Sequence, residues 1–360
     1  MKEKKKPTSL KFIYYDLPPI FTYLKFKKKF FLIYYYFWQI AIGIKANKLN
    51  RKYKYDIMHH LTGNMSWMPA GLALAKGKLI WGPIGSLNLP KESYKYLNFS
   101  EILFEKVRSI LKSILHNFDP LLRISFLKSV LILTHTPKYI PKYFLKKSRY
   151  FNQTYINDSK NMAIKKINFS RQKTLKIIYC GELKKWKGAE IGLESVLEFM
   201  KIYHNADFTI IGDGPCKNRI KKLREDSIYK ERIKLEGRLS LDEVVKKLNN
   251  GDIFLYPSYR HGLSTIVLQA MLSGLPVICI EGDETSRCVK ENNAGICVSL
   301  PESRKELISN ISSAINLLAN EEELRLKLAI NSQTTALKRY NYEIAIQRII
   351  KFYEKINDQK

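Results

Sequence analysis

The segment YPSYRHGLSTIVLQAMLSGLPVI, residues 256–278, contains the sequence signals that decide the fold class. It overlaps an apolar run at 252–258, passes through a short loop, and continues as a helical pattern from about Thr265 to Gly274. A second apolar run follows at 276–280. A strand, a loop, a helix and a further strand in this order form the repeating unit of a parallel α/β sheet.

The same alternation extends outward from this segment in both directions. Short apolar runs rich in β-branched residues lie at 175–180, 207–211, 232–237 and 295–298. Helical patterns separate them, and one of these begins with Ser240 and Glu243 at the spacing of a capping box. We therefore predict a domain over 151–340 with a parallel sheet that is covered by helices on both faces.

The first half of the chain carries weaker patterns of the same kind. Strand-like runs occur at 55–60, 78–85 and 129–137, and residues 101–115 have a helical pattern. This predicts a first α/β domain over 1–150, which opens without a clear strand followed by a Gly-rich loop. The basic stretch 138–174 is expected to connect the two domains. The last segment, 341–360, is expected to be a helix that packs back on the first domain.

The composition favours anionic partners. The 360 residues include 62 Lys and Arg against 33 Asp and Glu, a formal net charge of +29. Such an excess suits phosphorylated substrates, nucleic acid or an acidic membrane face. A coding bias toward Lys, Ile, Asn and Tyr is an alternative explanation for part of it. The basic residues are spread along the chain without a recognised nucleic-acid-binding motif, so we expect no nucleic-acid partner.

An aromatic run near the start, FFLIYYYFWQIAIGI at 30–44, lies between clusters of basic residues. It is short for a membrane span, which needs about 20 apolar residues. Two interpretations remain, a helix buried in the first domain or a helix lying in a membrane interface. The flanking lysines, Lys25, Lys27, Lys28 and Lys29 among them, lead us to expect attachment to the cytoplasmic face of an anionic membrane.

The cysteines agree with a cytoplasmic location. There are five, an odd number, and no two of them form a CxxC pair. Cys180 and Cys279 fall inside strand-like runs and are interpreted as reduced core thiols. No cleavable secretory signal is recognised.

In parallel α/β sheets, ligands bind beyond the carboxyl ends of the strands, next to helix N-termini that favour phosphate. The loop GELKKWKG, 181–188, follows one strand and brings several lysines to such an end. A lysine there can neutralise a leaving diphosphate, although a solvated basic loop has the same composition. GDGP at 212–215 follows the next strand, but position 217 is Lys, so the dinucleotide fingerprint G-x-G-x-x-G is incomplete. No P-loop and no histidine spacing typical of a zinc site occur.

Together, GELKKWKG, GDGP, the Pro-Ser loop and AMLSGLPVI resemble the retaining glycosyltransferase family 4, in order and spacing, over about 171–300. WGPIG and the preceding His59–His60 resemble a branch of that family that builds surface polysaccharides. The resemblance implies a GT-B fold, with two Rossmann-like domains facing across a cleft. It also implies that a nucleotide-diphosphate sugar is bound mainly by the second domain, with no catalytic metal or cofactor.

Carried over position by position, the resemblance implies a donor site formed by Gly181, Glu182, Lys187, Gly212, Gly214, His261, Gly262, Leu263, Ser264, Thr265 and Gln269. Glu182 stands where the family has an arginine. His261 and Gln269 stand where it has its two glutamates, the second of which bonds the ribose. Lys187 matches the family's lysine. The expected catalytic residues are His261, Lys187 and His60, although a lone histidine such as His60 is more often structural.

The function implied is transfer of a sugar, with retention, to a saccharide or lipid-linked saccharide in surface polysaccharide biosynthesis. Two alternatives remain open. The changes at Glu182, His261 and Gln269 are also compatible with a degenerate GT-B protein that binds nucleotide sugar or a partner without catalysis. The net charge alone is compatible with a nucleic-acid-binding protein.

Overall fold

A computed structural model describes residues 10–26, 30–61, 63, 65–85, 89–137, 140–156, 174–260, 262–282 and 284–358. The chain forms two compact units. The first contains Met1–Ser86, Ser109–Phe151 and Tyr353–Lys360, and the second contains Leu87–Arg108 and Asn152–Phe352. Predicted positions 27–29 and 261 lie outside the described residues.

The first unit is built on a four-stranded parallel sheet with strand order β1-β2-β3-β4. Its strands are β1 (Ile57–His60), β2 (Lys78–Ile84), β3 (Ser129–Thr134) and β4 (Ser148–Tyr150). Its helical elements are α1 (Pro19–Phe26), α2 (Phe31–Tyr53), η1 (Gly71–Leu74), α4 (Pro120–Lys128) and η4 (Lys142–Lys147). The strand β4 and the turn η4 lie in the stretch that the sequence predicts to be a connection, so that prediction is wrong for 142–150.

Helix α2 contains the aromatic run and is partly packed on its own unit. Gln39 and Gly43 are buried, and the Gln39 side chain accepts a hydrogen bond from the Gly71 amide at 2.7 Å. Other positions of the helix leave large apolar side chains exposed, including Phe31 and Phe37 at 41% and 45% of their surface. No helix in the described part of the chain is long and apolar enough to cross a membrane.

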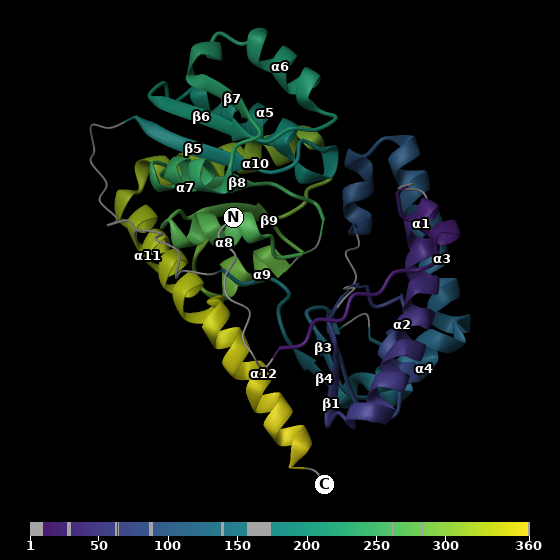
Figure 1. The fold of residues 1–360 in the computed structure, drawn as a ribbon. Coiled ribbons are helices and arrows are strands. Elements are labelled where there is room, and N and C mark those ends of the chain that lie inside the picture. Colours follow the sequence, from purple (N-terminus) through teal and green to yellow (C-terminus); the bar gives the residue numbers. More distant parts are fainter. Residues whose placement is uncertain are drawn as a thin grey trace. The chain divides into compact units, whose positions relative to one another are not determined.

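The second unit is built on six parallel strands in the order β10-β9-β8-β5-β6-β7. The strands are β5 (Leu175–Cys180), β6 (Ala206–Ile211), β7 (Ile233–Gly237), β8 (Ile253–Tyr256), β9 (Val277–Ile280) and β10 (Gly295–Val298). Each strand overlaps one of the apolar runs from which the sequence predicts a strand. The connecting elements are α5 (Ala189–Met200), α6 (Lys217–Glu225), α7 (Leu241–Asn249), α8 (Thr265–Leu272), α9 (Glu284–Glu291), α10 (Arg304–Asn320) and α11 (Glu322–Arg339) (Figure 1).

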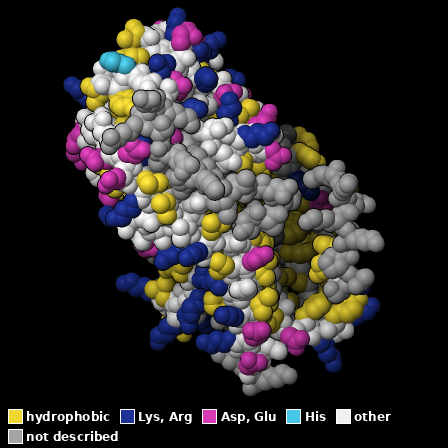
Figure 2. Space-filling view, turned by 90° about the vertical axis from the view of Figure 1, so that its left-hand side faces the viewer, with side chains coloured by type: hydrophobic (Ala, Val, Ile, Leu, Met, Phe, Trp, Pro, Cys, Tyr) yellow, Lys and Arg dark blue, Asp and Glu magenta, His cyan; other side chains and the backbone are white. Residues whose placement is uncertain are grey.

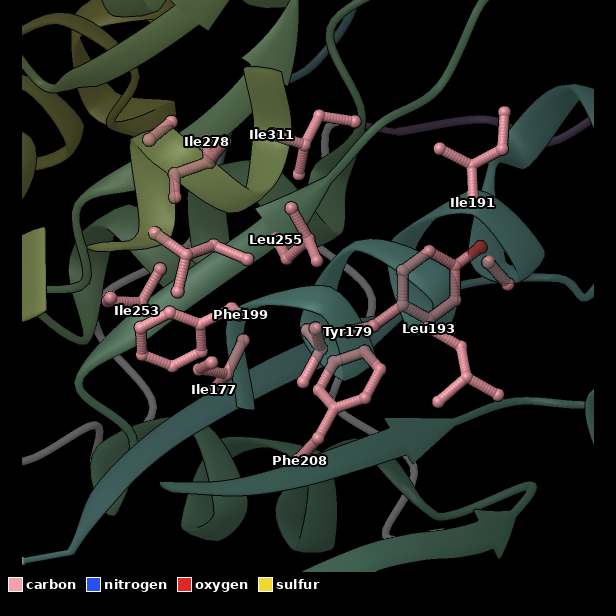
Figure 3. Packing of buried hydrophobic residues seen from close by; sticks show 14 of the residues in the cluster. Ile177, Tyr179, Ile191, Leu193, Phe199, Phe208, Ile253, Leu255, Ile278 and Ile311 are labelled. Atoms are coloured by element: carbon pink, nitrogen blue, oxygen red, sulfur yellow. The ribbon is translucent and has the colours of Figure 1, made fainter. Parts of the chain in front are cut away.

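Helices cover both faces of this sheet because the strand residues alternate between two cores. Ile177 and Tyr179 of β5 belong to the core that includes α5 and α10. Ile178 and Cys180 belong to the core that includes α7, α8 and α11. Figure 3 shows the first of these cores, in which Phe199 packs beside the β5 side chains. The predicted sheet with two covered faces is therefore confirmed, as is the capping box at Ser240.

Two elements carry residues of both units. Helix α3 (Phe99–Phe118) belongs to the second unit as far as Arg108, and α12 (Tyr342–Asn357) belongs to the first unit from Tyr353 onward. The turn η2 (Lys91–Tyr96) is part of the second unit. The segment 87–108 therefore differs from the predicted domain ranges, which place it in the first domain.

Contacts that are distant in sequence explain this difference. Tyr96 and Leu97 are buried in the core that contains β5, and the Tyr96 hydroxyl donates to the Pro301 carbonyl at 2.6 Å. These partners lie many residues away along the chain, so the local pattern of 87–108 gives no indication of them. The other predicted boundary, between 150 and 151, lies one residue from the change of unit between Phe151 and Asn152.

Candidate functional site

The strand order of the second unit locates its candidate site. In the sheet, β6 and β7 lie on one side of β5, whereas β8, β9 and β10, which come later in the chain, lie on its other side. The direction of strand addition therefore reverses between β5 and β8. In open parallel sheets the helices that follow two such strands lie on opposite faces, and ligands bind at the carboxyl ends where they diverge. The loops 181–188 and 257–264 follow β5 and β8 at this point in the sheet, which we call the switch point.

Backbone hydrogen bonds join the loop after β5 to the turn after β6. The Leu183 amide donates to the Asp213 carbonyl at 3.0 Å, and the Cys216 amide donates to the Leu183 carbonyl at 2.9 Å. Gly212 has φ +141°, and a Cβ there would lie 1.9 Å from the Gly181 carbonyl oxygen. Glycine at 212 is thus required by the close approach of the two loops, which holds the lysine-containing loop against the sheet.

Lys187, in the loop after β5, reaches the end of β8. Its Nζ donates to the Tyr256 hydroxyl at 2.9 Å and lies 5.5 Å from the centre of the Tyr256 ring. The next residue, Gly188, has φ +74°, and a Cβ there would lie 2.0 Å from the Pro257 carbonyl oxygen. The structure therefore brings Lys187 to the end of β8 as well as to the end of β5, with its charge oriented by a neutral partner.

Two helices begin at the switch point without a side-chain cap. Helix α5 starts after Gly188 and helix α8 after Ser264, and neither of these residues makes a capping side-chain hydrogen bond. The first amides of a helix lack partners within the helix and carry a partial positive charge. Together with Lys187, the two helix starts provide donors and positive potential suited to a phosphorylated ligand.

The backbone before α8 is held by two threonines. The Thr285 hydroxyl donates to the Gly262 carbonyl at 3.0 Å, and the Thr154 hydroxyl donates to the Leu263 carbonyl at 2.8 Å. These bonds orient a segment that contains three predicted donor-binding positions, 262 to 264. The predicted residue His261 lies next to this segment but outside the described residues.

Gln269 is the deepest of the predicted donor-binding residues. Only 6% of its surface is exposed, and its Oε1 atom has no hydrogen-bond partner among the described residues. A buried polar atom without a partner is costly, and in native structures it usually has one. Gln269 therefore presents an acceptor for a hydroxyl or amide group of a ligand.

Glu182, which replaces an arginine of the resembled family, is paired within its own loop. The Lys184 Nζ lies 2.7 Å from the Glu182 Oε1, with both side chains partly exposed. The loop therefore carries a carboxylate whose charge is largely balanced by its neighbour, and Lys187 remains the lysine directed toward β8.

Two histidines of the first unit, His59 and His60, lie at the end of β1. His60 is buried and pairs in register with Trp81 of β2. His59 Nδ1 is 2.6 Å from the Tyr353 hydroxyl, and its Nε2 is 2.7 Å from the Gly82 carbonyl. Burial lowers the pKa of His59, which favours a neutral ring with a structural role. His60 lies in the first unit and the other predicted site residues in the second, so His60 stays a prediction.

Several residues at the switch point were not predicted from the sequence. Tyr256 orients Lys187, and its place at the end of a predicted strand was the available signal. Glu105 and Arg260 form an ion pair. No local pattern links residues so far apart in sequence. Within the described ranges, no cluster of three or more His, Cys, Asp or Glu side chains is placed to hold a metal ion.

Part of the chain is similar to known glycosyltransferases. Residues 161–335 match the model of the family Glycosyl transferases group 1. This part of the chain is therefore similar to a glycosyl transferases group 1 domain. Of the positions discussed above, the matched range includes every predicted site residue of the second unit.

Two curated relatives and one solved structure illustrate the similarity. The chain is 23% identical over 180 residues to alpha-D-kanosaminyltransferase of Streptomyces kanamyceticus, covering 50% of this chain and 45% of that protein. It is 30% identical over 114 residues to N,N'-diacetylbacillosaminyl-diphospho-undecaprenol alpha-1,3-N-acetylgalactosaminyltransferase of Campylobacter jejuni, covering 32% and 29%. The chain thus matches less than half the length of either relative.

The solved structure is the pneumococcal O-GlcNAc transferase GtfA in complex with UDP and GlcNAc. It superposes with a TM-score of 0.56 at 14% identity and covers 88% of this chain and 59% of that one. At this identity the likeness shows the fold. The predicted GT-B fold class is confirmed, as two α/β units that each have a parallel sheet.

The close approach of Gly212 to Gly181 leads to a first prediction. Gly212→Ala forces a Cβ into a carbonyl oxygen and strains a positive φ, so the free energy of unfolding of the second unit should fall by at least about 1–3 kcal/mol. Gly237→Ala is the matched control, because Gly237 also has a positive φ but nothing lies within 4 Å of its Cβ position. Thermal unfolding of both variants checks this, and equal midpoints would contradict it.

Proposed function

We propose that this chain is a glycosyltransferase that takes a sugar from a nucleotide-diphosphate donor. The observation that carries the proposal is the contact of Lys187 with Tyr256 at the end of β8, in a region where two helices start without side-chain caps. A lysine and uncapped helix starts are groups that favour a diphosphate. The similarity to a glycosyl transferases group 1 domain supports it, and so does the similarity to a transferase structure that contains UDP and GlcNAc.

The roles of individual residues follow from their positions. Lys187 and the first amides of α5 and α8 neutralise the charge that develops on the leaving diphosphate. The backbone of Gly181, Gly212 and Gly214 keeps the loops close enough for the phosphates to meet those amides. The buried Gln269 Oε1 accepts a hydrogen bond from a ribose hydroxyl, as the resemblance implies.

In the reaction, the bond between the anomeric carbon and the diphosphate oxygen breaks, and a hydroxyl oxygen of the acceptor bonds to the same carbon. The proton of that hydroxyl passes to the departing diphosphate. Retention of configuration is inferred from the resemblance to family 4. His261 is proposed to contact the donor sugar, and His60 the acceptor side. The mechanism requires no metal or other cofactor.

The acceptor is proposed to be a saccharide or a lipid-linked saccharide in surface polysaccharide biosynthesis. One relative is named for an acceptor on diphospho-undecaprenol, and the resemblance points to the branch that builds surface polysaccharides. A nucleic-acid partner is less well supported, because the basic residues are spread along the chain without a recognised binding motif. On the face that Figure 2 shows, basic and acidic side chains are interspersed in the upper part, and basic side chains gather at the lower left. Nucleic-acid binders usually concentrate positive charge in a patch or stripe.

The experiment that tests this function combines binding and turnover. Nucleoside diphosphates and their sugars are screened for a rise in the melting temperature of the full chain, because a ligand that binds only the folded state must stabilise it. Positive donors are then tested for hydrolysis or transfer. Binding without turnover would support the degenerate alternative, which the changes at Glu182 and Gln269 favour. Failure to bind any of them would refute both.

The second prediction concerns Lys187. Lys187→Ala removes the cation from the switch point and should weaken binding of the stabilising nucleoside diphosphate by about 1–3 kcal/mol, the range for a charge-assisted hydrogen bond. Lys217→Ala is the control, since Lys217 lies after β6 and is paired with Asp213 on the surface. Calorimetric titration gives both affinities. An unchanged affinity for Lys187→Ala would remove this residue from the donor site.

We further propose that the protein works at the cytoplasmic face of a membrane through its first unit. Helices α1 and α2 expose Ile20, Phe26 and Phe31 beside a lysine-rich segment. Each basic residue near an anionic surface contributes about 1 kcal/mol, and partly buried aromatic side chains add to this. The alternative is that lysine stems cover apolar surface of a protein that stays in solution.

The third prediction tests this attachment with vesicles. The full chain should sediment with vesicles of phosphatidylglycerol and phosphatidylcholine but not with phosphatidylcholine alone, and less so as salt rises. Changing Lys25, Lys27, Lys28 and Lys29 to Gln should reduce binding. The matched control changes four exposed lysines of the second unit, Lys221, Lys222, Lys230 and Lys246, to Gln. Equal binding to both kinds of vesicle would contradict the proposal.

A further inference from the structure

A partly buried cluster of charged and aromatic side chains connects the two loops of the switch point. The Arg260 guanidinium lies 4.5 Å from the centre of the Trp186 ring and forms an ion pair with Glu105 of α3. Trp186 directly precedes Lys187, and Arg260 directly precedes the segment that leads to α8. Each of the two loops therefore has one residue in this cluster, next to a predicted donor-binding position.

The backbone joins the same two loops. The Trp186 carbonyl accepts from the Tyr259 amide at 2.8 Å and from the Ser258 hydroxyl at 3.3 Å. Tyr259 stacks on Tyr96, with ring centres 5.3 Å apart and planes within 6° of each other. The loop after β8 is thus held on one side by Trp186 and on the other by the segment 87–108.

Because the Glu105 carboxylate is buried, its ion pair with Arg260 fixes the position of the Arg260 side chain. The Glu105 side chain is 8% exposed and pairs with both Arg260 and Arg108. The Arg108 Nη1 lies 3.1 Å from the Glu105 Oε2. A buried ion pair adds little net stability compared with apolar packing, but breaking it leaves a costly unpaired charge. Such a pair therefore restricts where Arg260 can lie.

An open pocket lies beside the cluster. It has a volume of about 150 Å³ and is lined by Glu105 and Trp186, together with Leu89, Leu97, Ser100, Glu101 and Phe104. The Arg260 guanidinium is held by its ion pair with Glu105 and by its contact with the Trp186 ring.

We propose that Glu105, Arg260 and Trp186 form a clamp that fixes the separation between Lys187 and the 262–265 segment at the donor site. The three are positioning residues, and none of them needs to touch the donor. The inference rests on the proposed function, because a fixed separation of the two loops matters only if they bind one ligand together. It adds the segment 87–108 to the elements that determine donor binding.

The fourth prediction is that Glu105→Gln loosens the clamp without unfolding the unit. The substitution keeps the shape of the side chain and removes its charge, so Arg260 loses its ionic partner. In the ligand-free full chain, hydrogen exchange should become faster at the Tyr259 amide and across 262–265. With the donor found above, kcat should fall at least about tenfold, since small displacements of binding groups have large effects on rate. The variant should remain folded, with a lower melting temperature because Arg260 loses its ionic partner.

The matched control is Glu302→Gln, whose carboxylate pairs with Lys95 and is 97% exposed. It should change neither exchange nor turnover. The variants Arg260→Gln and Glu105→Gln/Arg260→Gln complete a double-mutant cycle with Glu105→Gln. If the two residues act through each other, the double variant loses no more activity than Arg260→Gln alone.

The outcomes separate the clamp from the proposed function. Unchanged exchange in Glu105→Gln would overturn the clamp, even in an active enzyme. Faster exchange with unchanged kcat and KM would overturn its positioning role. If the unsubstituted chain neither binds nor turns over any donor, the proposed function and the clamp's role in donor binding are both overturned. Hydrogen exchange at the Tyr259 amide would still report whether Glu105 holds the contact between the two loops.

Discussion

The structure of the second unit depends on the burial of β5 on all sides. The strand has neighbours on both edges, β6 and β8, and its side chains enter two separate cores. Apolar surface on both faces of a sheet has to be covered, which requires helices on each side and crossovers between consecutive strands. The carboxyl ends of the strands, and the loops that leave them, are then the natural place for ligand-binding groups. The candidate site lies there because the core occupies both faces of the sheet.

Close contact between loops converts this sheet edge into a defined site. The turn after β6 holds the loop after β5 by backbone bonds, and the loop after β8 meets the same loop at Pro257 and Trp186. Glycine at 212 and 188 permits these approaches, since any other residue would place a Cβ against a carbonyl oxygen. The charged groups, Lys187 foremost, are thereby fixed on a rigid backbone frame, which limits the reorganisation required when a charged ligand binds.

The sequence predicts those parts of the structure that depend on local patterns. The strands β5 to β10, the start of α8 and the capping box at Ser240 follow from short apolar runs and from the spacing of polar residues. β4 does not, because three residues in a basic stretch carry no periodicity. The assignment of 87–108 to the second unit and the Glu105–Arg260 pair depend on contacts between distant segments, which no local pattern encodes. For the site, position in the loops was predictable, whereas orientation, such as that of Lys187 by Tyr256, was not.

The charge around the switch point explains how the site can depart from the resembled family and still suit a diphosphate. The family pattern places an arginine, a lysine and two glutamates here. In this chain Glu182 is balanced by Lys184, Lys187 keeps its charge, and Gln269 is neutral. The loss of one cation is thus accompanied by the loss of negative charge at 261 and 269, so the local balance does not become more negative. A neutral amide at 269 also avoids the cost of burying a carboxylate whose partner arrives only with the ligand. The substitutions therefore compensate one another electrostatically, which is compatible with the proposed binding of a diphosphate.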